Sequence, residues 1–268
     1  SRTYPTTITV TTTTETTTST TATSTTITTS TTWGYPSLFC LEVMMTTNYE
    51  FGLVKEQIRR GAGIFNCDEY AVFSQSERTL LGAPPHGPTI HTLHFEGAFV
   101  GVSQDGTAGN TLLFMHLWEA VKKDGRWEDH DWTVKADPDA VVIPWRIRTH
   151  LAKATGPTNY LVNCNKVPGN PNFPMIFGAF EAFSKPSLKE YFGGGDERCK
   201  RELQWQPWGE DFFMHHCMKH LGIQEYDDFG ILSDKRCMGA NCGDGWAGAY
   251  HDFKDQFSWF QCWDIATR

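Results

Sequence analysis

The chain has 268 residues, with 23 Lys and Arg against 31 Asp and Glu, which gives a formal net charge of −8. This acidic balance argues against a nucleic-acid partner, because phosphate binding needs clustered basic side chains. No run approaches the roughly 20 apolar residues that a membrane span needs, and the length suits one large domain or two small ones.

Residues 1–32 differ in composition from everything that follows, since they are almost entirely Thr and Ser. They hold too little apolar surface to build a core, so we expect an extended tract: an O-glycosylated stem, or a segment that pairs with other copies of the chain. Ile8, Val10 and Ile27 would be the apolar anchors of such pairing. The threonines expected to carry O-linked sugars are Thr11, Thr12, Thr13, Thr14, Thr16, Thr17, Thr18, Thr20, Thr21, Thr28 and Thr29.

Residues 33–268 have the composition of a globular domain. SLFCLEVM at 37–44 is a candidate strand, and YEFGLVKEQIRRG at 49–61 has apolar residues at helical spacing and ends in Gly. A second apolar strand run lies within AGIFNCDEYAVFS at 62–74. A strand, a helix and a strand over this length indicate a βαβ unit, which predicts the α/β class with a mainly parallel sheet.

Helices and strands continue to alternate along the rest of the chain. TLLFMHLWEAVKKDG at 111–125 predicts an amphipathic helix that ends at Asp-Gly, and GEDFFMHHCMKHLG at 209–222 predicts another whose acidic start suits the helix dipole. Between them we expect a helix at 143–156 and a strand-turn-helix at 178–195. The last part, residues 230–268, is expected to be rich in loops.

The eight cysteines are an even number, which favours disulfides and therefore an oxidising compartment, although free buried thiols are the alternative. We expect at least two disulfides, one of them involving Cys237, Cys242 or Cys262. These three cysteines and His251 could also bind zinc, but disulfide pairing is the better explanation of a cysteine-rich tail.

Asp137-Pro138-Asp139 follows directly after a short apolar run, at the end of a candidate buried strand. Proline forces the residue before it into an extended conformation, so both carboxylates can reach past the strand end. Two carboxylates in that position suit a hard divalent cation. The alternatives are an ordinary turn and a helix N-cap at Asp139.

A second acidic pair, Glu210 and Asp211, opens a predicted helix. One of the two could act as a general base, and the alternative is favourable charge at a helix start. Trp205 and Trp208 lie just before the pair, where flat rings could contact the C–H faces of a sugar or simply pack in the core. Asp139 and Asp211 could also form the carboxylate pair of a glycoside hydrolase, but nothing in the sequence fixes their separation.

Four segments carry the candidate site residues and occur in this order along the chain: VKADPDAVV, FGAFEAFSKPSL, WGEDFFMHHCMKHLGI and AGAYHDFKD. This order resembles the GT-A class of nucleotide-sugar glycosyltransferases, and most of all its fringe-like, beta-1,3-glycosyltransferase type. The resemblance covers roughly residues 37–262. It departs from the family at Pro138, where the middle Asp is usual, and at Ala140, where Thr or Val is usual.

The resemblance implies a GT-A-like fold with helices on both faces of the sheet, and a metal-dependent site. Asp139 would bind Mn²⁺ or Mg²⁺ directly, Asp137 would contact the ribose or a metal-bound water, and His251 would be the third protein ligand. Imidazole favours Mn²⁺ over Mg²⁺. Asp211 would be the catalytic base, with Glu210 as the second candidate.

Asp68, after the expected strand run IFNC, is a further candidate, which could hydrogen-bond the nucleotide base or ribose. Trp205 and Trp208 are candidates for contact with the donor. The leading hypothesis is therefore an inverting glycosyltransferase of the secretory lumen (Golgi-like) or cell exterior. It would transfer a sugar from a nucleotide sugar to a hydroxyl of a glycan or glycoprotein. The alternative is an extracellular, fibre-forming glycoprotein whose Thr-rich residues 1–32 mediate assembly while the glycosyltransferase-like domain, residues 33–268, is inactive.

Overall fold

The computed structural model describes residues 8–13, 24–29, 35–104, 106–165, 173–237, 239 and 241–268. The chain forms two compact units, the first of residues 1–35 and the second of residues 36–268. Within the described residues, no helix is both long and apolar enough to cross a bilayer.

The first unit contains two strands, β1 (Ile8–Thr13) and β2 (Ser24–Thr29), which pair antiparallel. Val10 lies opposite Ile27 in the register of this pairing, so the two positions are paired within one chain. Both strands are extended, as β-branched Thr favours. Six of the expected glycosylation positions, Thr14, Thr16, Thr17, Thr18, Thr20 and Thr21, lie outside the described residues. Glycosylation of the tract stays a prediction.

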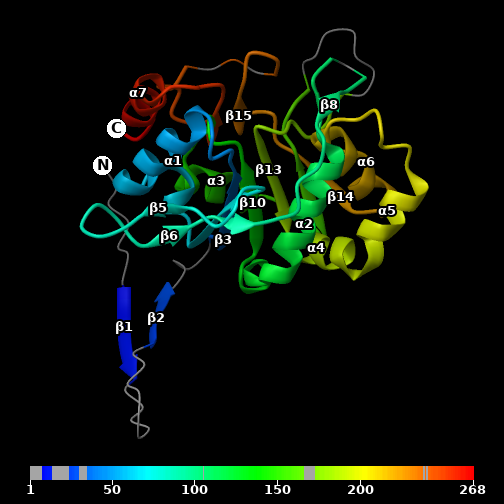
Figure 1. The fold of residues 1–268 in the computed structure, drawn as a ribbon. Coiled ribbons are helices and arrows are strands. Elements are labelled where there is room, and N and C mark those ends of the chain that lie inside the picture. Colours follow the sequence, from blue (N-terminus) through cyan, green and yellow to red (C-terminus); the bar gives the residue numbers. More distant parts are fainter. Residues whose placement is uncertain are drawn as a thin grey trace, which may run out of the picture. The chain divides into compact units, whose positions relative to one another are not determined.

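The second unit is built on a seven-stranded sheet with the order β14-β12-β13-β10-β3-β4-β7 (Figure 1). Only β13 runs antiparallel to its neighbours, and the other pairs are parallel. The sheet is therefore mixed and mainly parallel, as predicted. The strands are β3 (Leu38–Val43), β4 (Glu69–Ser74), β7 (Leu93–His94), β10 (Trp132–Ala136), β12 (Asn159–Val162), β13 (Phe180–Ser184) and β14 (Gln224–Asp227).

Helices cover both faces of this sheet. Side chains alternate between the two faces along each buried strand, so both faces present apolar side chains that have to be covered. On β3, Phe39 and Leu41 face the core under α2 (Thr111–Asp124) and α6 (Glu210–His220), whereas Leu38 and Cys40 face the core under α1 (Tyr49–Arg60) and α3 (Pro144–Leu151). The expected α/β fold class, with a mixed, mainly parallel sheet and helices on both faces, is confirmed. Helices α1 and α2 end at Gly61 and Gly125, both in the left-handed conformation, as their sequences predict.

Shorter elements complete the sheet connections. The expected strand-turn-helix at 178–195 forms as β13 followed by α4 (Lys185–Glu190) and a π-helical turn, Tyr191–Gly195, which leads into α5 (Asp196–Glu202). Other short elements are the 3₁₀ helices Gly63–Asn66 and Arg126–Asp129, and the paired strands β5 (Leu80–Gly82) with β6 (Ile90–His91) and β8 (Gly101–Val102) with β9 (Ala108–Gly109).

The C-terminal part is more regular than predicted. It contains helix α7 (Gln256–Ala266) where we expected loops. Its N-cap is Asp255, whose carboxylate accepts a hydrogen bond from the Ser258 amide at 2.9 Å. Trp259, Phe260 and Cys262 lie on its buried face. The Asp-x-x-Ser start and the helical spacing of apolar residues are signals in the sequence that could have predicted this helix.

All eight cysteines form disulfides: Cys40–Cys67, Cys164–Cys237, Cys199–Cys217 and Cys242–Cys262. The prediction of at least two disulfides with one in the C-terminal tail is confirmed. The alternative zinc site is not formed, because Cys237, Cys242 and Cys262 are all in disulfides and cannot supply thiolate ligands.

Removing the disulfide that ties α7 to the preceding loop should measurably destabilise the second unit. Cys242 and Cys262 are 20 residues apart, and closing a loop of about that length stabilises a fold by roughly 3 kcal/mol. We expect the double change Cys242→Ser and Cys262→Ser to lower the free energy of unfolding by about that amount in urea titrations. An unchanged urea midpoint would show that α7 is held by packing alone.

Candidate active site

The Asp137-Pro138-Asp139 segment leaves the sheet at the carboxyl end of the central strand β10. The Asp137 amide donates to the Ala179 carbonyl at 3.1 Å, and the Ala140 amide donates to the Asp137 carbonyl at 2.9 Å, which closes a turn. A turn is therefore present, and it displays both carboxylates. The N-cap of α3 is Ile143, so the alternative that Asp139 caps this helix is wrong.

A small second sheet returns His251 to this turn. Strands β11 (Val141–Val142), β16 (Ala249–Tyr250) and β15 (Leu232–Ser233) form it, with Val141 opposite Tyr250. This register places the residue after β16 beside the residues before β11. The Phe253 amide donates to the Asp139 carbonyl at 2.9 Å and fixes the returning segment.

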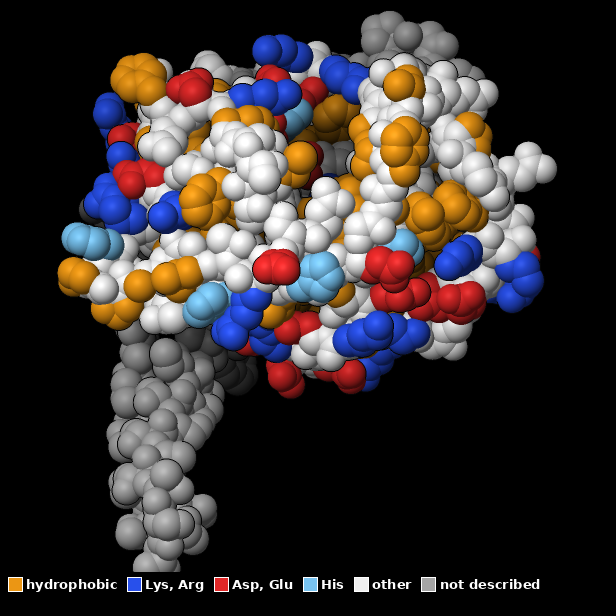
Figure 2. Space-filling model, viewed as in Figure 1, with side chains coloured by type: hydrophobic (Ala, Val, Ile, Leu, Met, Phe, Trp, Pro, Cys, Tyr) orange, Lys and Arg blue, Asp and Glu red, His pale blue; other side chains and the backbone are white. Residues whose placement is uncertain are grey.

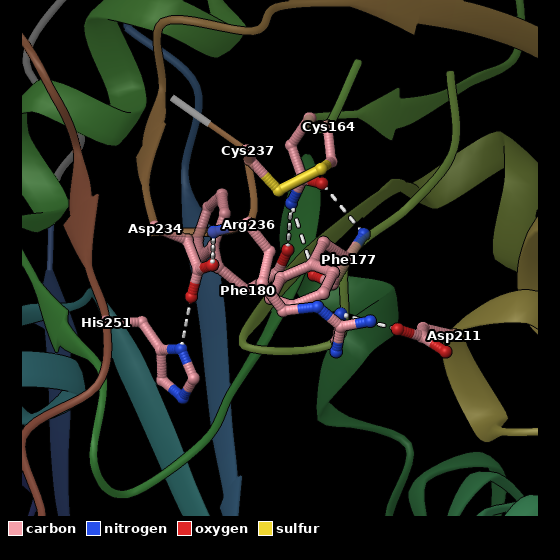
Figure 3. The surroundings of a disulfide bond; sticks show 10 residues. Cys164, Phe177, Phe180, Asp211, Asp234, Arg236, Cys237 and His251 are labelled. Carbon is pink, nitrogen blue, oxygen red and sulfur yellow. Dashed lines mark hydrogen bonds and ion pairs between the residues drawn. A yellow bond between two sulfur atoms is a disulfide. The ribbon is translucent and has the colours of Figure 1, made fainter. Parts of the chain in front are cut away.

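Asp137, Asp139 and His251 form a group that could hold a metal ion, because one ligand atom of each lies within 4.8 Å of the others. His251 Nε2 is 3.6 Å from Asp139 Oδ1, and His251 Nδ1 is 2.5 Å from Asp234 Oδ2 (Figure 3). A carboxylate on the far nitrogen orients a metal-binding imidazole. Two carboxylates and an imidazole suit Mn²⁺, so the residues present fit such an ion.

Asp139 and His251 favour each other's charged forms in the absence of a cation. Burial alone would lower the pKa of His251, but the ion pair with Asp139 and the hydrogen bond to Asp234 raise that pKa to about 9. Burial opposes ionisation of Asp139, yet His251 lowers the pKa of this carboxyl below its usual value. His251 is therefore protonated at neutral pH, and a cation that binds here has to displace this proton.

A buried lysine on β10 joins this group to other acidic residues. Lys135 Nζ donates to the Gly178 carbonyl at 2.7 Å, and lies 3.0 Å from Asp137, 3.2 Å from Glu181 and 3.5 Å from Glu210. Burial disfavours its charge, but the surrounding carboxylates raise the pKa of Lys135. We call Lys135, Asp137, Glu181 and Glu210 the Lys135 cluster.

The two members of the second acidic pair have different surroundings at the start of α6. Glu210 is buried in the Lys135 cluster, where burial and the charge of Glu181 raise its pKa. Asp211 is only partly buried, and its carboxylate accepts hydrogen bonds from the amides of Gly178 at 3.1 Å and Phe212 at 2.8 Å. Figure 3 shows the Arg236 side chain pointing toward Asp211. Asp211 is thus the more accessible carboxylate of the pair.

A cavity of about 310 Å³ adjoins both groups of acidic residues. Its lining includes Asp137, His251, Glu210, Asp211 and Trp208. Figure 2 shows the molecule hollowed on this side, with hydrophobic side chains on the rim. The other aromatic or apolar lining residues include Phe114, Phe173, Met175, Phe177 and Phe212. Carboxylates beside aromatic rings can bind a polar molecule that also has apolar faces.

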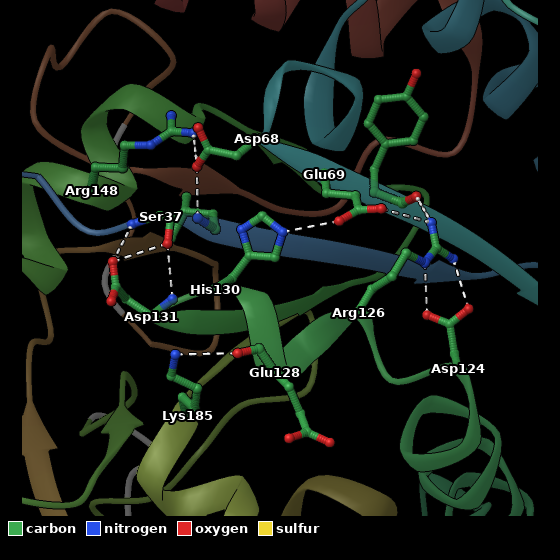
Figure 4. A network of polar contacts seen from close by, with 12 residues as sticks. Ser37, Asp68, Glu69, Asp124, Arg126, Glu128, His130, Asp131, Arg148 and Lys185 are labelled. Carbon is green, nitrogen blue, oxygen red and sulfur yellow. Dashed lines mark hydrogen bonds and ion pairs between the residues drawn. The ribbon is translucent and has the colours of Figure 1, made fainter. Parts of the chain in front are cut away.

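The structure does not bring Asp68 or Trp205 to this cavity. The run before Asp68 forms a 3₁₀ helix, and strand β4 begins only at Glu69, so Asp68 lies at the amino edge of the sheet. There it accepts hydrogen bonds from the Leu38 amide and from Arg148, both at 2.7 Å (Figure 4). Trp205 packs against the core, and its indole donates to the Lys200 carbonyl.

Sequence reasoning missed three residues that shape the site: Lys135, Glu181 and Asp234. A charged residue inside the buried strand WTVKA was a usable signal for Lys135, because an unpaired cation is rarely buried. Nothing local marks Glu181 or Asp234. Their partners are 46 and 17 residues away in the sequence, so only the fold reveals them.

No protein-family model matches this chain, and no curated protein matches it. Among solved structures, the chain is similar to a glycosyltransferase involved in the glycosylation of the major capsid of PBCV-1, at 12% sequence identity and a TM-score of 0.44. The similarity covers 74% of this chain and 84% of that chain. The functional proposal therefore rests on the residues of the site.

Proposed function

We propose that the second unit is an inverting, metal-dependent glycosyltransferase that uses a nucleotide sugar as its donor. The observation that carries the proposal is one cavity lined by Asp137 and His251, two members of the group that they form with Asp139, and by the acidic start of α6. The first group suits the diphosphate end of a donor, and the second suits the attacking hydroxyl of an acceptor.

Asp139 and His251 would hold Mn²⁺, or Mg²⁺, with Asp137 beside them. Once bound, the cation would offset the negative charge that develops on the departing nucleoside diphosphate. Asp234 holds the His251 ring through Nδ1, which directs Nε2 toward Asp139. The disulfide Cys164–Cys237 anchors the segment that carries Asp234 (Figure 3).

Asp211 would accept the proton of the acceptor hydroxyl. The acceptor oxygen forms a bond to the anomeric carbon while the bond from that carbon to the diphosphate breaks. The electron pair leaves with the diphosphate, and the configuration at the carbon is inverted. The Gly178 and Phe212 amides orient the Asp211 carboxylate for this role. Trp208 would contact a C–H face of the sugar.

The four disulfides favour the secretory lumen, including a Golgi-like compartment, or the cell exterior. The acceptor would then be a glycan or glycoprotein, and residues 1–32 would be an O-glycosylated stem. A fibre-forming glycoprotein is the alternative function. The extended, paired strands β1 and β2 are the observation that favours it, because such strands can also add strands from another chain.

Deleting residues 1–32 separates these two functions. Because the chain divides into two units near residue 35, we expect the remaining domain to keep its free energy of unfolding within about 1 kcal/mol. Light scattering should then report a monomer, and an activity assay should show that this monomer still transfers sugar. If the full chain forms assemblies that the deletion abolishes, and neither form releases a nucleoside diphosphate from any donor, the fibre-forming alternative is correct.

A further inference from the structure

Lys135 is the ammonium that three carboxylates of the site surround, although neither the proposed metal binding nor the proposed proton transfer uses it. Its side chain is 1% exposed and lies on the face of β10 that points toward α2, where Nζ is 4.7 Å from the centre of the Phe114 ring. A buried ammonium is retained only where partners compensate for its lost hydration. Here three carboxylates and a carbonyl surround it.

These partners belong to two different parts of the site. On one side, Lys135 lies 3.0 Å from Asp137 Oδ1, beside the candidate metal ligands. On the other side, it donates to the Gly178 carbonyl, while the Gly178 amide donates to Asp211 at 3.1 Å. Lys135 also lies 3.5 Å from Glu210, the neighbour of Asp211 at the start of α6. One ammonium group therefore connects Asp137 with the residues that orient Asp211.

The contact with Asp137 has a consequence for metal binding. An oxygen that is paired with an ammonium is a poor ligand, so Oδ1 of Asp137 is withheld from a cation while Lys135 is in place. The ammonium also repels any cation that binds near Asp137. Both effects weaken metal binding but keep a coordination position open for another ligand, such as a diphosphate oxygen.

We propose that Lys135 is a positioning residue that restrains Asp137 from full metal coordination and fixes Asp211 relative to it through Gly178. This inference rests on the proposed glycosyltransferase function. Removing the Lys135 ammonium should therefore strengthen metal binding and at the same time weaken sugar transfer.

The test is designed so that the variant loses one buried charge of each sign. Glu181 lies directly opposite Lys135 in the pairing of β10 with β13 and contacts its ammonium. The double variant Lys135→Met with Glu181→Gln removes one charge of each sign, and Glu181→Gln alone is the matched control, because it leaves the contact between Lys135 and Asp137 intact. Circular dichroism and thermal unfolding show whether each variant folds.

Mn²⁺ alone is the probe. We expect the double variant to bind Mn²⁺ on the order of tenfold more tightly than Glu181→Gln, measured by electron paramagnetic resonance. The water-proton relaxation caused by bound Mn²⁺ should fall, because Asp137 replaces a water ligand. Sugar transfer should fall by about 10²-fold, since the base loses its support.

A folded double variant with Mn²⁺ affinity equal to or below that of Glu181→Gln would overturn the role of Lys135. A wild-type chain that binds no Mn²⁺ would instead refute the metal centre and the proposed function, before any variant is compared. If the double variant does not fold, Lys135→Gln takes its place, because its amide can still donate to the Gly178 carbonyl. The same rise in Mn²⁺ affinity is expected, and its absence counts against the proposal.

Discussion

Replacing Asp139 by Asn is expected to lower the affinity for Mn²⁺ by at least about 100-fold, because loss of an outer partner of a metal ligand alone costs about 10–100-fold. Asp139 is nearly buried between His251 and Tyr49, whose hydroxyl donates to it at 3.3 Å. The amide of Asn keeps the size of the side chain and removes its charge. Calorimetric titration of the variant with Mn²⁺ measures the change.

Asp255→Asn is the matched control for this prediction. Asp255 caps α7 and lies outside the candidate metal group, and Asn is an equally good N-cap residue. It should bind Mn²⁺ like the wild type. If Asp139→Asn also bound Mn²⁺ with unchanged affinity, Asp139 would be an ordinary turn residue and the metal centre would lie elsewhere.

Replacing Asp211 by Asn should lower kcat for sugar transfer by about 10²–10⁴-fold, the usual contribution of a positioned general base. KM for the donor should change little, because Asp211 does not belong to the group that could hold the metal ion. Rapid-quench or steady-state assays of nucleoside diphosphate release give both constants. Unfolding by heat should be nearly unchanged, since Asp211 is only partly buried.

Glu210→Gln distinguishes the two candidate bases. Glu210 is 3% exposed and contacts Lys135, so its replacement should perturb the Lys135 cluster and lower stability more than it lowers kcat. If Glu210→Gln lost transfer at full stability while Asp211→Asn kept most of its kcat, Glu210 would be the base and the assignment given to Asp211 would be reversed.

The fold was predictable where the signal is local. The alternation in SLFCLEVM places successive side chains on opposite faces of β3, and Gly61 ends α1 at the predicted residue. Asp68 shows the limit of such signals. The apolar run before it is a 3₁₀ helix and not a strand, so Asp68 precedes a strand instead of following one and lies at the opposite edge of the sheet.

The candidate site was predictable only in part, and for a physical reason. Asp137 and Asp139 are neighbours in sequence, so their pattern is visible there. His251 reaches them only through the pairing of β11 with β16, and the resemblance to a family was the sole pointer to it. The contacts of Lys135 with Glu181 and Glu210 span 46 and 75 residues, and no local rule couples such positions.

The most direct test of the proposed function is a calorimetric titration of the wild-type chain with a panel of nucleotide sugars, with Mn²⁺ and then with Mn²⁺ removed by a chelator. We expect at least one nucleotide sugar to bind, and this binding to disappear with the metal. If no nucleotide sugar binds in the presence of Mn²⁺, or if binding is the same without it, the chain is not a metal-dependent glycosyltransferase.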